Sequence, residues 1–146
     1  MLILTLLGLS MVNALFCLVS YKLKNFDIMQ IIGSFLLLVG AVFIALFINQ
    51  SNVITLFDNF IYIDALSSIN LVLIATVGFT ASIYSVGYMR TELAHDIISL
   101  KKLGFYYCFF HLFILSMLLV TIFNNLGLLW VGIELTTLIS AMLVAF

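Results

Sequence analysis

The chain has 146 residues, of which 66% are hydrophobic and 8% are charged, and its formal net charge is −1. A soluble domain has about 45–50% apolar and 25% charged residues, so this composition excludes a soluble globular protein, and we expect a lipid bilayer and no nucleic acid around it. The mean hydropathy of +1.37 and the apolar blocks of about 20 residues, each long enough to cross a hydrocarbon core, predict an all-α membrane protein.

Five transmembrane helices are predicted within one membrane domain that covers residues 1–146. Their ranges are 2–21, 28–49, 65–89, 105–123 and 126–146. The first lacks the basic start and the small-residue cleavage site of a secretory signal, so we expect it to remain as a helix. The last has no polar or aromatic residue after it, unlike a helix that ends at a water interface. We therefore expect the chain to be the N-terminal part of a longer subunit.

Basic residues predict the orientation of the helices. The first connection carries Lys22 and Lys24, the third carries Arg90, Lys101 and Lys102, and the second and fourth carry none. Since cytoplasmic connections are rich in Lys and Arg, the first and third should face the cytoplasm. The N-terminus should then be extracytoplasmic.

Two of the connections have patterns of their own. Residues 50–64 mix β-branched and aromatic residues with turn formers, which favours a small hairpin at the outer surface. Residues 91–103 place Leu93, Ile97 and Leu100 at i, i+4 and i+7, which predicts an amphipathic helix at the membrane interface.

Glu134 is an acidic residue in the fifth apolar block. It lies nine residues after Asn125, a good N-cap, and therefore ~13 Å into the membrane at ~1.5 Å per residue. Acids at such depth usually face a bundle interior or a wet cavity and often carry ions or protons. Trp130 and Thr137 share its helix face. We rank proton transfer first, and a protonated Glu134 that ties two helices by a hydrogen bond is the alternative.

Other polar residues in the helices carry weaker predictions. His111 lies ~9 Å inside the fourth predicted helix; an imidazole there suits a proton relay and equally a neutral core histidine bonded to a backbone carbonyl. Asp64 is predicted to cap the third helix, and Cys17 and Cys108 to be packing residues. No catalytic residue, metal-ligand set or cofactor-binding motif appears, so any redox centre must belong to another subunit.

Four segments together resemble a known family. They are Tyr-Ile-Asp-Ala-Leu at 62–66, Ile-Tyr-Ser-Val-Gly-Tyr-Met at 83–89, Tyr-Tyr-Cys-Phe-Phe-His-Leu-Phe at 106–113 and Asn-Leu-Gly-Leu-Leu-Trp-Val-Gly-Ile-Glu-Leu-Thr-Thr-Leu at 125–138. The sequence resembles the antiporter-like membrane subunits of respiratory complex I and its hydrogenase relatives. It is most similar to the hydrogenase-4 and formate hydrogenlyase branch, over residues 56–146.

The resemblance implies a proton-translocating subunit of a membrane-bound oxidoreductase in the inner (cytoplasmic) membrane. Its implied partners are other membrane subunits and a peripheral electron-transfer arm, with iron–sulfur centres and a nickel–iron or quinone centre in those partners. Glu134 matches the family's essential glutamate, which pairs with a lysine on a later helix; that lysine has no counterpart here. A multisubunit Na⁺/H⁺ antiporter, or a non-conducting membrane scaffold, is the alternative function.

Overall fold

The computed structural model describes residues 2–20, 26–51, 53–56, 60–95 and 98–145. Within these ranges it contains five helices and one hairpin, which are α1 (Leu2–Ser20), α2 (Phe26–Ser51), β1 (Ile54–Leu56), β2 (Ile61–Ile63), α3 (Ala65–Ala94), α4 (Leu100–Ile122) and α5 (Leu126–Val144). All five helices are long and apolar enough to cross a membrane. The prediction of a multi-pass, all-helical membrane protein is confirmed.

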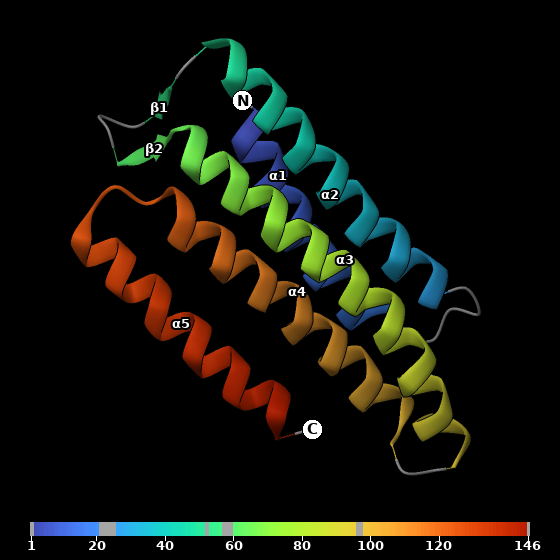
Figure 1. Cartoon of the computed structure of the whole chain (residues 1–146). Helices are drawn as coiled ribbons and strands as arrows, with labels where there is room; N and C mark the ends of the chain where they lie inside the picture. The colour runs from blue at the N-terminus through green and yellow to red at the C-terminus, as the bar shows by residue number, and fades with distance from the viewer. Residues whose placement is uncertain (1, 21–25, 52, 57–59, 96–97, 146) are drawn as a thin grey trace.

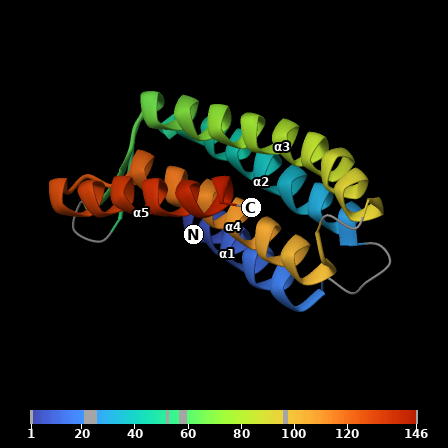
Figure 2. The same ribbon diagram turned by 90° about the horizontal axis from the view of Figure 1, so that it is seen from below.

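The helices lie in two layers (Figure 1). α2 packs against α3, α1 packs against α4, and α5 packs against α4 at the edge of the molecule. Seen from below, α2 and α3 lie above α1, α4 and α5 (Figure 2). Between the layers, Leu37, Ile44, Leu71 and Leu118 are almost completely buried. The core therefore lies within α1–α4, and α5 is attached to its side.

The predicted hairpin is confirmed. β1 and β2 pair antiparallel, with Ile54 opposite Ile63. The hairpin also holds the α4–α5 turn, since Ile61 forms a β-bridge with Phe123 and the Asn124 N–H donates to the Phe60 carbonyl at 2.9 Å. The second and fourth connections are thus joined by backbone hydrogen bonds at one end of the bundle.

The first and third connections lie together at the other end. Arg90 Nε, near the end of α3, donates to Asp27 Oδ2, in the first turn of α2, at 2.6 Å. Arg90, Lys101 and Lys102 are all exposed there, whereas Lys22 and Lys24 lie outside the described residues. This arrangement agrees with the pairing of connections that the basic residues predicted, and the side that faces the cytoplasm stays a prediction.

The predicted amphipathic helix over residues 91–103 is wrong. α3 continues to Ala94 and α4 already begins at Leu100, so the residues assigned to one interfacial helix belong to the ends of two long ones; Ile97 lies outside the described residues. The physical reason is capping: the Ser99 side chain accepts a hydrogen bond from the Lys102 N–H and starts α4. The predicted ends of the third and fourth helices follow the ends of the apolar blocks, whereas the helices themselves continue into the polar residues.

Two predicted N-caps are confirmed. Asp64 Oδ1 accepts from the Ser67 N–H at 2.8 Å, and Asn125 Oδ1 accepts from the Gly127 and Leu128 N–H groups at 2.9 and 3.3 Å. The hydrogen bond from the Ser67 backbone holds the pKa of the Asp64 carboxyl below its usual value. These caps fix where α3 and α5 begin, and the Asn125 cap thereby fixes the position of Glu134 along α5.

Candidate functional site

Glu134 lies near the middle of α5, on the face that points away from α1–α4. It is eight residues beyond Leu126, or ~12 Å along the helix. Glu134 and Thr137 are exposed, and 64% of Trp130 is exposed. The predicted common face is therefore present, and we call these three residues the Glu134 stripe. Among the described residues, none forms a hydrogen bond or ion pair with the Glu134 carboxyl.

An open hollow of about 450 Å³ lies beside the Glu134 carboxyl. Its lining residues are Val131, Glu134, Leu135, Thr137 and Leu138. All belong to α5, so the hollow is an open surface of this one helix.

The opposite face of α5 fixes the helix against α4. Gly132 and Ile139 are its buried residues in the described part of the chain. A Cβ added at Gly132 would lie 2.8 Å from Val120 Cγ2, so the two helices approach closely there. One turn on, Thr136 Oγ1 donates to Ser116 Oγ at 3.1 Å. This docking fixes the orientation of α5 and keeps the Glu134 stripe outward.

His111 is completely buried among α1, α2 and α4. Gln30 Nε2 lies 2.6 Å from His111 Nε2, and Cys17 Sγ donates to Gln30 Oε1 at 3.0 Å. The hydrogen-bond partner of the imidazole is therefore a side-chain amide and not a backbone carbonyl. Because α4 begins at Leu100 and not at the predicted Phe105, His111 lies eleven residues, or ~16 Å, from the start of the helix.

The structure does not bring Glu134 and His111 together. The Thr136–Ser116 hydrogen bond sets the α4–α5 register, which places Glu134 level with Leu118 of α4. His111 is seven residues, or ~10 Å along the axis, from that level, and it is buried while Glu134 is exposed. The two residues form two separate sites.

Gln30 is the polar residue that sequence reasoning missed. It is 3% exposed and bridges Cys17 and His111. Cys17 is therefore a buried packing residue, as predicted, and also donates a hydrogen bond to Gln30. The available signal was a lone amide in the apolar run Ile28-Met-Gln-Ile-Ile32. Buried amides need partners, but the partner lies 81 residues away.

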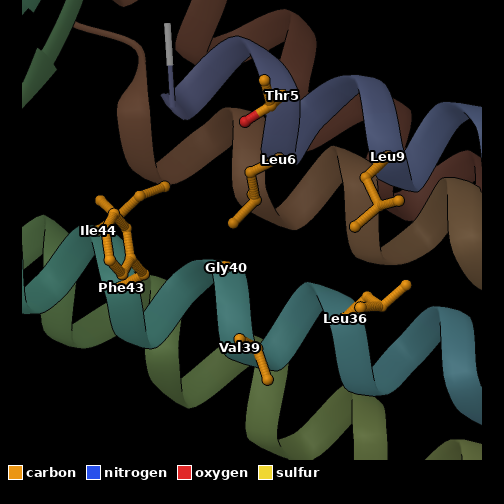
Figure 3. A pocket seen from close by; sticks show the side chains of 8 residues that line it. All are labelled: Thr5, Leu6, Leu9, Leu36, Val39, Gly40, Phe43 and Ile44. Atoms are coloured by element: carbon orange, nitrogen blue, oxygen red, sulfur yellow. The ribbon is translucent and has the colours of Figure 1, made fainter.

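One further pocket has an almost wholly apolar lining. A pocket of about 390 Å³ lies between α1 and α2 (Figure 3), and its lining residues are Thr5, Leu6, Leu9, Leu36, Val39, Gly40, Phe43 and Ile44. Within the described part of the chain, no three His, Cys, Asp or Glu side chains are grouped so that they could hold a metal ion. The polar groups that could do chemistry are thus the Glu134 stripe and the Gln30–His111 pair.

Comparison with known proteins identifies relatives of this chain. Residues 57–95, which include β2 and α3, match a family model described as NADH-Ubiquinone oxidoreductase (complex I), chain 5 N-terminus. A hydrogenase-4 component F homolog from Methylacidiphilum infernorum is 30% identical over 125 residues, 86% of this chain and 25% of that protein. A Na⁺/H⁺ antiporter subunit A1 from Staphylococcus haemolyticus is 34% identical over 86 residues, 59% of this chain and 10% of that protein.

The chain matches only part of each of these larger proteins. The chain spans a quarter of the length of the hydrogenase-4 relative and a tenth of the antiporter subunit. The family match covers residues 57–95, inside the predicted range of 56–146. The match to the hydrogenase-4 relative extends further, since 125 of 146 residues cannot fit between residues 56 and 146, so the similarity also includes part of the region that α1 and α2 occupy. Five spanning helices, this family match and these relatives together confirm the predicted resemblance to the antiporter-like membrane subunits of complex I, hydrogenases and Na⁺/H⁺ antiporters.

Proposed function

We propose that this chain is the N-terminal part of a proton-translocating subunit in a hydrogenase-4 or complex I-like oxidoreductase, and that Glu134 takes up and releases the transferred proton. The observation that carries the proposal is the position of the Glu134 carboxyl, midway along a spanning helix and without a partner among the described residues. An ionised carboxylate at that depth is costly unless a cation or hydrogen-bond donors approach it. Its charge can therefore follow the arrival and departure of a partner.

The partner of Glu134 is proposed to pack on the Glu134 stripe. The described lysines, Lys101 and Lys102, lie exposed in the first turn of α4, far along the bundle from the middle of α5. The open hollow beside Glu134 offers a place for a side chain from another helix. The family resemblance implies that this side chain is a lysine.

We propose that redox chemistry takes place in partner subunits. Iron–sulfur centres and a nickel–iron or quinone centre would lie there, next to a peripheral arm, and the whole complex would lie in the inner (cytoplasmic) membrane. His111 is a second candidate for proton transfer, because its imidazole is the one buried histidine side chain in the described helices.

A Na⁺/H⁺ antiporter is the second candidate function. The 34% identity to a Na⁺/H⁺ antiporter subunit A1 favours it over any unrelated transporter. Genes for hydrogenase or dehydrogenase subunits beside this gene would support the oxidoreductase, and a set of small antiporter genes would support the antiporter. Both functions use Glu134 in the same way, so the test of that residue serves both.

The test is Glu134→Gln in the intact complex, because glutamine keeps the shape and removes the ionisable proton. Proton transport into inverted membrane vesicles, followed by the quenching of a pH-sensitive dye, should fall to the level of vesicles without the complex. Assembly should be unchanged. Thr137→Val, on the same stripe, is the matched control and should transport normally. Normal transport by assembled Glu134→Gln would contradict the proposal and favour a membrane scaffold.

A further inference from the structure

Several polar side chains lie buried in the α1–α4 bundle near His111. His111 and Ser82 are completely buried, as is Tyr107. Four buried polar atoms have no hydrogen-bond partner among the described residues: Asn13 Nδ2, Ser82 Oγ, Tyr107 Oη and His111 Nδ1. Buried polar groups nearly always have a partner in a protein or an ordered water molecule. Four such atoms in one bundle therefore point to a ligand that is rich in hydrogen-bonding capacity.

Contacts between α2 and α4 place two of these atoms one turn apart. The ring of Phe26 contacts the ring of Tyr107, with centroids 5.5 Å apart, and four residues later Gln30 bonds His111. α2 packs mainly against α1 and α3, and α4 also packs against these two, so α2 and α4 lie diagonally across the bundle and these two side-chain contacts set their relative level. Tyr107 Oη and His111 Nδ1 lie on successive turns of α4.

Contacts from α1 and α3 bring the other two atoms to the same zone. Cys17 bonds Gln30, and Asn13 lies one turn further along α1, where it packs against Gly33 of α2. On α3, which runs antiparallel to α4, the Ser85 hydroxyl bonds the Tyr106 hydroxyl at 3.1 Å, so Ser82, three residues before Ser85, lies between the levels of Tyr107 and His111. Three helices therefore contribute the unpaired polar atoms, one each from α1 and α3 and two from α4, and Gln30 of α2 bonds His111 in the same stretch of the bundle.

The Gln30 amide determines which His111 nitrogen carries the proton. Its Nε2 can only donate, so His111 Nε2 accepts that hydrogen bond, and the neutral ring then carries its proton on Nδ1. The Gln30 carbonyl oxygen is already used, because it accepts from Cys17. The His111 Nδ1–H is consequently a buried donor that needs an acceptor from outside the described side chains.

We propose that α1–α4 enclose an internal water-binding site, in which water accepts the hydrogen bond of His111 Nδ1–H and pairs the unpaired atoms of Asn13, Ser82 and Tyr107. A buried water typically makes about three hydrogen bonds, and the site offers donors and hydroxyl groups that can act either way. Gln30 is a positioning residue, since it acts through His111. The site extends the role proposed for His111 and requires nothing of Glu134, so the two proposals can fail separately.

Nuclear magnetic resonance of the full chain in lipid bilayers tests the site. The chain has two histidines, and with ¹⁵N-histidine labelling the exposed His95 is an internal reference. His111 should show a protonated Nδ1 and an unprotonated Nε2, and magnetisation from water should reach its ring. If water reaches His95 but not His111, or if His111 carries its proton on Nε2, the proposal is overturned.

Two variants test separately the effect of the Gln30 amide on the His111 tautomer and the presence of water beside the ring. Gln30→Met keeps the length of the side chain and removes the donor, so His111 should lose its preference for Nδ1–H while water still reaches the ring. Ser82→Ala removes one hydroxyl of the site and should weaken the transfer from water, whereas Ser140→Ala on α5 should not. An unchanged tautomer in Gln30→Met, or equal transfer in Ser82→Ala and Ser140→Ala, would overturn the proposal.

Discussion

His111 and Glu134 both lie near the middle of a membrane-spanning helix, yet their surroundings are opposite. His111 is buried where three helices meet, and it is bonded to Gln30. Glu134 is exposed on a helix that packs mainly against one neighbour. In the first case this chain supplies the surroundings of the ionisable group, and in the second the described residues leave the carboxyl exposed and without a partner.

This difference separates a self-contained part of the molecule from a dependent one. The α1–α4 bundle buries apolar side chains from all four helices, so its packing and its polar cluster are properties of this chain. α5 leaves large apolar side chains such as Leu126, Val131 and Leu138 exposed. We therefore expect a partner of this chain to pack against α5 and to control the protonation of Glu134.

The sharpest way to test the comparison is to remove the buried amide. Gln30→Ala leaves His111 Nε2 and the Cys17 thiol without a partner and opens a cavity, so the free energy of unfolding should fall by ~2–4 kcal/mol. Reversible unfolding in mild detergent, followed by circular dichroism, measures this loss. Glu134→Gln is the control, since it changes an exposed side chain and should shift the free energy by less than ~0.5 kcal/mol. Equal losses in both variants would contradict the comparison.

A second prediction concerns the attachment of α5. Gly132→Val places methyl groups where Val120 of α4 already lies, and such overpacking costs ~1–3 kcal/mol. Trp130, the one tryptophan of the chain, reports on α5, so its fluorescence should change while circular dichroism shows the helices intact. Gly87→Val is the matched control, because a Cβ at Gly87 meets nothing within 4 Å. Loss of helical structure in Gly132→Val would mean that α5 is part of the core.

The smallest predicted effect is at the N-cap of α3. Since the pKa of Asp64 is lowered in the folded chain by the Ser67 N–H, its ionised form stabilises the fold above a pH of about 4, the usual carboxyl value. This stabilisation is lost as the pH falls through the lowered pKa. Asp64→Asn keeps a capping oxygen that does not titrate, so the free energy of unfolding should depend less on pH below 4. An unchanged pH dependence in Asp64→Asn would contradict this role.

Hydropathy predicted the existence and order of the five helices but not all of their ends. α3 extends five residues beyond the predicted Met89, and α4 begins five residues before the predicted Phe105. The polar residues there, such as Arg90 and Lys101, are compatible with a helix in water. A hydropathy pattern detects where lipid ends, whereas a helix ends where its backbone groups find a cap.

The sites were predictable only where the determinants are local. Asp64 and Asn125 were found because a cap bonds residues two or three positions away. The face shared by Trp130 and Glu134 followed from helical spacing alone. The Gln30–His111 pair was not found, because it depends on how two distant helices pack.

The same pair has a consequence for biosynthesis. Gln30 and His111 are 81 residues apart, and α1 packs mainly against α4. α1 and α2 emerge from the ribosome before α4, so Gln30 is a polar amide whose imidazole partner is made much later. Until α4 inserts, α1 and α2 form an incomplete interface, and nascent chains that end before His111 should be preferred substrates for membrane quality-control proteases.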